Sequence, residues 1–264
     1  MHIFPAGIHH RVVLFLTFAL LSGCATVPSE DRHPADPFER YNRAVFAFND
    51  SLDRAVLKPT AEVYSELPQP VRTGVGNFFS NLDDFRVAFN NALQGKFHDA
   101  ASDTARILFN STFGILGLID VASPMGLPKH NEDFGQTLGV WGVPSGPYLQ
   151  IPFLGPSSAR DGPALAVDFY TNPRNYTLGD QRELRDNFWA LLVLDVVNIR
   201  AGLLATEDLL AAYSDDRYVA VRDLWLQRRE FLVRDGAVVD DGDWLDELDE
   251  LEALEALDRE EGLQ

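Results

Sequence analysis

One long amphipathic segment sets the pattern for the rest of the chain. Residues 36–56 read DPFERYNRAVFAFNDSLDRAV. Asp36, followed by a proline and by Glu39, is typical of a helix start, because the carboxylate can cap free backbone N–H groups and proline suits the first helical position. Apolar residues then recur at steps of three and four until Lys58-Pro59, which indicates the helix end. The apolar positions are Phe38, Tyr41, Val45, Phe48, Leu52 and Val56.

Shorter helices separated by proline and glycine are predicted to follow this segment. Their expected ranges are 60–67, 70–79, 82–93 and 97–113. Residues 114–162 are rich in Gly, Pro and Ser, which predicts loops, a short helix at 115–121 and one small hairpin around Tyr148–Ile151. Three more helices are expected at 159–170, 183–204 and 216–233. We therefore expect one mainly α domain over residues 36–234, in which short helices form a curved layer.

The N-terminus has the order of a secretory signal. Val12–Leu21 is a ten-residue apolar run after Arg11, and small residues follow it. Leu21-Ser22-Gly23-Cys24 matches a bacterial lipobox, and Cys24 is the only cysteine in the chain. We expect residues 1–23 to be removed by cleavage between Gly23 and Cys24, Cys24 to be lipidated, and residues 24–35 to form a tether. Lipoproteins that stay in the inner membrane carry an aspartate directly after the lipidated cysteine. This chain has Ala25 at that position, which favours the outer membrane. An uncleaved apolar N-terminus with an incidental cysteine is the alternative.

Charge and hydropathy exclude some classes of protein. The formal net charge is −18, from 22 basic and 40 acidic residues, so nucleic-acid binding is not expected. No uninterrupted apolar run reaches the roughly 18 residues of a membrane-spanning helix, because Phe188–Leu194 ends at Asp195. Residues 235–264 hold 13 acids and one base. Their leucines recur every third residue and form no single stripe, which predicts a solvated or disordered acidic tail, with a partner-binding helix as the alternative.

The sequence offers no catalytic set and no metal site. His33, His98 and His130 have no second histidine or cysteine at a ligand spacing, and Gly142–Gly146 is one residue off a nucleophile elbow. The paired acids Asp83-Asp84 and Asp215-Asp216 are interpreted as helix caps. A protein that is not an enzyme and holds no cofactor is the simplest interpretation.

The apolar residues leave two interpretations open. Phenylalanine (18 residues) outnumbers tyrosine and tryptophan together (7 and 4), and dense apolar segments such as Phe109–Ile119 lie in short predicted helices. These residues either form one packed core or place helices in a membrane interface, with the apolar face in the acyl layer and the polar residues turned inward.

Ordered motifs from residue 36 to 234 resemble the MlaA (VacJ) family. They are Asp36–Arg43 with Phe46 and Phe48-Asn49, Asp120–Ala122, Phe134–Gly139, Gly146–Tyr148, Pro152–Gly155, Arg160-Asp161, Ser214-Asp215, Tyr218, Val221-Arg222, Gln227–Arg229 and Phe231. The resemblance implies a ring-like, all-helical lipoprotein in the inner leaflet of the outer membrane, facing the periplasm. In that family, phospholipid mislocalised to the outer leaflet passes through an amphipathic pore to the periplasmic carrier MlaC, and trimeric porins hold the ring.

A pore of this kind needs polar groups along the path of the lipid head group. The predicted lining residues are Asn42, Arg43 and Asn49 on the first helix, and Arg160 and Asp161 near the Gly-rich centre. Surface solvation or helix capping would equally explain them. Arg228 and Arg229 are interpreted as charges at a helix end. Two other functions stay open: a structural scaffold for envelope partners, and an envelope lipid hydrolase.

Overall fold

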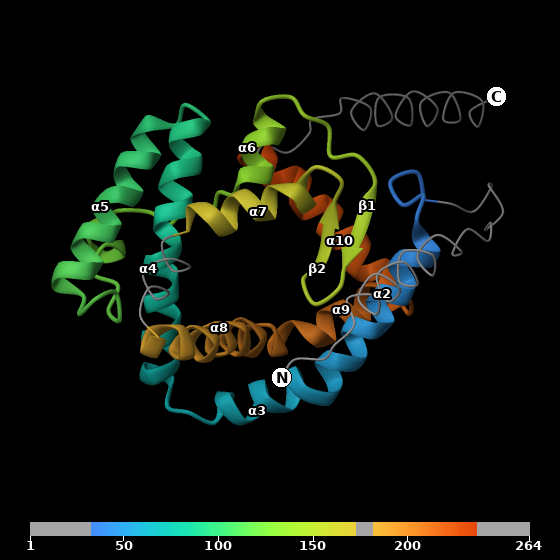
Figure 1. Cartoon of the computed structure of the whole chain (residues 1–264), viewed down its shortest axis with the longest axis horizontal. Helices are drawn as coiled ribbons and strands as arrows, with labels where there is room; N and C mark the ends of the chain where they lie inside the picture. The colour runs from blue at the N-terminus through green and yellow to red at the C-terminus, as the bar shows by residue number, and fades with distance from the viewer. Residues whose placement is uncertain (1–32, 173–181, 237–264) are drawn as a thin grey trace, which may run out of the picture.

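A computed structural model describes residues 33–172 and 182–236 of the chain. These residues form a mainly α-helical domain with one small hairpin, and Figure 1 shows the helices arranged around an open centre. The prediction of a mainly α, ring-like domain is confirmed. The predicted signal peptide, Cys24, and most of the tether and acidic tail lie outside the described residues. The elements are α2 (Glu39–Leu52), η1 (Asp53–Leu57), α3 (Lys58–Ser65), α4 (Gln69–Leu93), α5 (Phe97–Phe113), η2 (Ser123–Met125), α6 (Phe134–Val140), β1 (Tyr148–Ile151), β2 (Gly155–Ser158), α7 (Asp161–Thr171), α8 (Arg182–Gly202), η4 (Leu204–Thr206), α9 (Glu207–Tyr213) and α10 (Arg217–Val233).

The start of α2 differs from the prediction, because Asp36 is not a helix cap. Phe38 occupies the cap position, and Asp36 is fully buried. Its carboxylate accepts hydrogen bonds from Asn42 Nδ2 at 2.7 Å and from the Tyr218 hydroxyl, and it lies 3.5 Å from Arg222. Asp36 therefore connects the start of α2 to α10.

The first helix also does not end at Lys58-Pro59. The π-helical turn η1 follows α2 directly, and the N–H of Lys58 donates to the carbonyl of Asp53, five residues back. Pro59 then lies in the first turn of α3, where it forgoes only the one hydrogen bond that an N–H would make to the preceding turn. The chain thus stays helical from residue 39 to 65.

Two further helix boundaries are corrected by the structure. The predicted helices at 70–79 and 82–93 are one continuous helix, α4, so Asp83 and Asp84 lie in a helix interior and not at a cap. Asp84 is buried and pairs with Lys129 and Arg106. By contrast, Asp216 does cap α10, since its carboxylate accepts from the N–H groups of Tyr218 and Val219.

The predicted helix at 115–121 is instead a tight turn at the end of α5. Ile115 and Leu116 adopt positive φ angles of 53° and 55°, and Gly117 adopts 91°. The side chain of Asn81 fills the space where a Cβ on Gly117 would lie, at 2.7 Å. The turn leaves Ile115 and Leu116 exposed, together with Phe113. It forms an apolar tip, which a helix of the predicted length would not.

The predicted hairpin is present, and α2 completes its outer edge. Strands β1 and β2 are antiparallel, with Tyr148 opposite Ser158. Asn42 accepts from the N–H of Gln150 at 2.8 Å and donates to the carbonyl of Tyr148 at 3.0 Å. One heptad later, Asn49 accepts from the N–H of Phe153 at 2.8 Å and donates to the carbonyl of Ile151 at 3.0 Å. The two amides bind four backbone groups of the hairpin.

Burial follows an inverted pattern. Among the described residues, 23 polar or charged side chains are buried against 11 apolar ones, while 33 large apolar side chains are exposed. A water-soluble domain of this size normally buries its large apolar residues. The distribution agrees with the second interpretation of the sequence, in which polar residues turn inward.

Helix α8 corrects the expectation that no segment could cross a membrane. Trp189–Thr206 is long and apolar enough to do so by length and composition alone, and 11% of this window is buried. This window is not an uninterrupted apolar run. The window instead contains Asp195, which is buried, and Arg200, which is paired with Asp53 and Glu207.

We predict that Asn42→Ala lowers the free energy of unfolding by about 3 kcal/mol, because it leaves two buried hairpin backbone groups without their partner and removes one of the hydrogen bonds to the Asp36 carboxylate. Urea unfolding of the full-length protein in detergent, followed by circular dichroism, measures this. Arg40→Ala is the control, because Arg40 is exposed on the same helix. Equal stability of the two variants would contradict the assigned role of Asn42.

Candidate functional site: a central cavity with charged and apolar walls

The open centre of the fold holds a cavity of about 1100 Å³. Its wall comes from α4, the segment before α6, the hairpin, α7, α8 and α10, which surround the centre in Figure 1. Apolar and charged side chains line it together. The apolar lining includes Phe79, Leu154, Leu165, Phe169, Leu192, Ile199, Trp225 and Leu232. The charged lining is Asp83, Arg86, Asp133, Asp161, Asp168, Asp195, Arg228 and Arg229.

Arg229 binds two aspartates from distant parts of the chain. Its guanidinium lies 2.6 Å from both oxygens of Asp133 and 2.8 and 3.0 Å from those of Asp161. Burial by itself raises the pKa of Asp133, but the hydrogen bonds and charge of Arg229 and the N–H of Gln136 outweigh it and lower that pKa to about 2. A Cβ on Gly135 would lie 2.3 Å from Arg229, so this close packing needs glycine. The three charged residues join α6, α7 and α10.

Arg86 and Asp168 form a second charged part of the wall. Arg86 lies 2.6 Å from Asp83 and 4.0 Å from Asp168, and it donates to the carbonyl of Glu132 at 2.7 Å. Asp168 accepts from the N–H of Phe134 at 2.9 Å. Burial raises the pKa of Asp168 to about 6, with a further contribution from the charge of Asp133, despite the opposing effect of Arg86. Asp168 is therefore a carboxylate on the cavity wall whose pKa lies well above the ordinary value.

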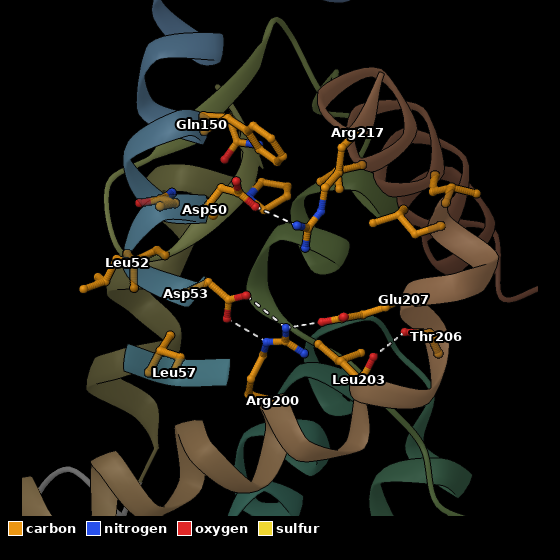
Figure 2. Close-up of a pocket in the computed structure, with 18 of the residues that line it drawn as sticks. Asp50, Leu52, Asp53, Leu57, Gln150, Arg200, Leu203, Thr206, Glu207 and Arg217 are labelled. Atoms are coloured by element: carbon orange, nitrogen blue, oxygen red, sulfur yellow. Dashed lines mark hydrogen bonds and ion pairs between the residues drawn. The ribbon is translucent and has the colours of Figure 1, made fainter. Parts of the chain in front are cut away.

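A side cavity of about 810 Å³ lies between α2, the hairpin and α8–α10. Figure 2 shows that its charged groups form one pair and one group of three. Arg217 lies 2.8 Å from Asp50, and Arg200 binds both Asp53, at 2.6 Å, and Glu207. Most of its remaining lining is apolar, including Leu52, Leu57, Leu203 and Leu210. The tip of the hairpin contributes Leu154 and Pro156 to both cavities. The hairpin tip thus lies between the two.

The predicted lining residues are distributed differently from the expectation. Asp161 lines the central cavity and Asn49 lines the side cavity. Asn42 is buried in its contacts with the hairpin. Arg43 pairs with Glu39 and Asp216 outside both cavities. Arg160 is buried and pairs with Asp161 from behind the wall. Asn42, Arg43 and Arg160 are not among the lining residues of either cavity.

The main charged residues of the central wall were not found from the sequence. Arg86, Asp133 and Asp168 were not proposed, and Arg228 and Arg229 were interpreted as charges at a helix end, although both line the cavity. The available signal is that the motifs at 134–139, 152–155, 160–161 and 227–229 contain or adjoin this wall. Nothing in a single sequence pairs Asp133 with a residue 96 positions away. The described residues also contain no group of three His, Cys, Asp or Glu side chains placed to hold a metal ion.

Comparison with known proteins decides the family. A family model described as MlaA lipoprotein matches residues 34–232. The chain belongs to the MlaA lipoprotein family. The match spans every described element of the cavity wall and confirms the family that the motifs indicated.

Relatives of known sequence and structure agree with this assignment. The Escherichia coli K12 intermembrane phospholipid transport system lipoprotein MlaA is 35% identical over 234 residues, which cover 84% of this chain and 88% of that protein. The Haemophilus influenzae protein of the same name is 30% identical over 236 residues, covering 85% and 90%. A solved structure, reported as the structural basis for maintenance of bacterial outer membrane lipid asymmetry, matches with a TM-score of 0.62 at 33% identity and covers 75% of this chain and 98% of that chain.

We predict that Asp168→Asn removes part of the pH dependence of stability. A carboxylate with a raised pKa holds its proton more tightly in the folded state, so wild-type stability falls as pH rises from the ordinary value of 3.8 to about 6. Above that window the loss amounts to about 3 kcal/mol. The variant should be more stable than wild type at neutral pH and similar at low pH, as measured by urea unfolding across this range. Asp215→Asn, at an exposed position outside both cavities, is the control; a parallel shift in both variants would contradict the prediction.

Proposed function

We propose that this protein is an outer-membrane lipoprotein whose central cavity carries phospholipid from the outer leaflet towards the periplasm, without chemical conversion, and so maintains lipid asymmetry. The observation that carries the proposal is the inverted distribution of side chains: most large apolar residues are exposed, and charged as well as apolar residues surround a central cavity. The names of the Escherichia coli and Haemophilus influenzae relatives, and the subject of the similar solved structure, support it.

The wall chemistry suits a lipid with a charged head and apolar chains. Moving a charged head group through hydrocarbon is costly unless polar groups replace its water. Arg86, Asp133 and Asp168 place such groups around the cavity, and Leu165 and Phe169 line the same space for the chains. The outer surface, with Val193 and Leu116 exposed, fits the acyl layer of a bilayer.

The remaining parts of the proposal rest on the sequence and on the family resemblance. Residues 1–23 would be removed and Cys24 would carry the lipid anchor in the inner leaflet of the outer membrane. Residues 24–35 would act as a tether, and the acidic tail from residue 235 would lie in the periplasm. By resemblance, trimeric porins hold the protein and the periplasmic carrier MlaC receives the lipid.

Filling the central cavity tests the transport path. Ala166 is exposed on the cavity wall, so Ala166→Trp adds a large side chain to the path without entering a packed core. We expect surface-exposed phospholipid to rise to the level of a deletion strain while helicity and protein abundance stay normal. Amine-reactive labelling of intact cells measures the exposed lipid.

The control for this substitution is Ala101→Trp, an exposed alanine on α5 that lines neither cavity. It should behave as wild type. Wild-type asymmetry in the Ala166→Trp strain would remove the central cavity from the path, and an unchanged deletion strain would favour a scaffold. Release of fatty acid from labelled phospholipid by the purified protein would favour a hydrolase.

Cys24→Ser tests the anchor. Several acyl chains on one cysteine give stable membrane attachment, each buried methylene contributing about 0.8 kcal/mol. The variant should lose acylation, detected by mass spectrometry, and should leave the outer-membrane fraction. If the unacylated protein still fractionates with the outer membrane, the exposed apolar surface is the dominant anchor instead.

A further inference from the structure

One face of α10 presents a cation and apolar groups to the central cavity. Trp225, Arg228, Arg229 and Leu232 all line it. Their spacing of three, four and seven residues places them on the same side of the helix. The two arginines are neighbours in sequence, but their surroundings differ.

Arg229 and Arg86 have their positive charge compensated by the protein. Arg229 makes four short contacts to Asp133 and Asp161, and Arg86 binds Asp83 and faces Asp168. Their guanidinium groups hold the wall together. A ligand anion would have to displace a carboxylate to bind either one.

Arg228 is the third arginine of the described cavity wall, and no carboxylate of the described residues pairs with its positive charge. It is exposed to the cavity, and it makes no hydrogen bond or ion pair with any residue in the part of the chain that the structure describes. Trp225 and Leu232 flank it at one turn on either side. An uncompensated guanidinium can bind a phosphate, and the apolar side chains on either side of it can contact acyl chains.

We propose that Arg228 binds the phosphate diester of a phospholipid inside the central cavity, while Trp225 and Leu232 contact the first part of its acyl chains. This rests on the proposed function and names the chemical group that the cavity recognises. A guanidinium offers parallel N–H groups that match two phosphate oxygens. The carboxylates elsewhere on the wall repel the same anion, so the phosphate is directed to α10.

The test captures lipid inside the cavity of the full-length, lipidated protein. A photocrosslinking amino acid replaces Leu165, which is exposed on the cavity wall, and in a second protein it replaces Leu108, an exposed leucine on α5 outside both cavities. Both proteins are placed in bilayers of phosphatidylethanolamine containing diacylglycerol, which has the same chains and no phosphate. Mass spectrometry counts each captured lipid.

Arg228→Gln should lower capture of phosphatidylethanolamine at position 165 by about tenfold, because a neutral amide cannot make the charge-assisted hydrogen bonds of a guanidinium to phosphate. Capture of diacylglycerol at position 165, and of both lipids at position 108, should not change. Arg228→Glu should reduce phosphatidylethanolamine capture further, and Arg228→Lys should retain part of it. Arg234→Gln is the matched control, because Arg234 lies at the end of the same helix, pairs with Glu230 and does not line the cavity.

The outcomes separate this inference from the proposed function. If wild-type protein captures no lipid at position 165, the cavity does not hold phospholipid and the proposed function fails. If wild-type protein captures phosphatidylethanolamine and Arg228→Gln captures it equally, the cavity function stands and the assignment of Arg228 is overturned. Equal loss of phosphatidylethanolamine and diacylglycerol in Arg228→Gln also overturns it, because the arginine would then act on cavity shape and not on the phosphate.

Discussion

The hairpin has an open edge, and its backbone N–H and carbonyl groups need partners before it can be buried. Asn42 and Asn49 supply them from α2, and the carbonyl of Ala35 accepts from the N–H of Tyr148 at 2.7 Å. The segment before α2 and α2 itself thus take the place of a third strand. This contact fixes the hairpin tip between the two cavities, so the position of both cavities depends on it.

The central wall depends in turn on charge compensation between segments far apart in sequence. Asp133 caps α6 and binds Arg229 of α10, while Asp161 begins α7 and binds the same arginine. Removing one partner from such a buried group leaves an uncompensated charge and is strongly destabilising. A wall built in this way keeps charged groups at the centre of a fold whose large apolar side chains are mostly exposed, which is the reverse of a water-soluble domain.

The sequence predicts the helices with strong periodicity and a hairpin around Tyr148–Ile151, and α5 begins and ends at the expected residues. Predictions from local sequence rules were wrong where contacts with distant residues determine the structure. Pro59 did not end the helix because a π turn absorbs it, and Asp36 did not cap because Asn42, Tyr218 and Arg222 bind it. The family motifs located the site, but choosing its lining residues required knowledge of which helix face turns inward. The seven-residue step between Asn42 and Asn49 places both on one side of α2, and that side contacts the hairpin.

The π turn η1 also preserves the angular register of the helix that follows it. Each residue of an α-helix corresponds to about 100° of rotation, so one residue inserted into a regular helix would turn everything after it by that angle. A π turn instead takes up the extra residue within a single turn. The buried face of α3, with Ala61 and with Tyr64 donating to Asn198 of α8, therefore still points at its partner helix. The chain thus carries one more residue between α2 and α3 than a regular helix would hold, and the later helices of the ring keep their direction.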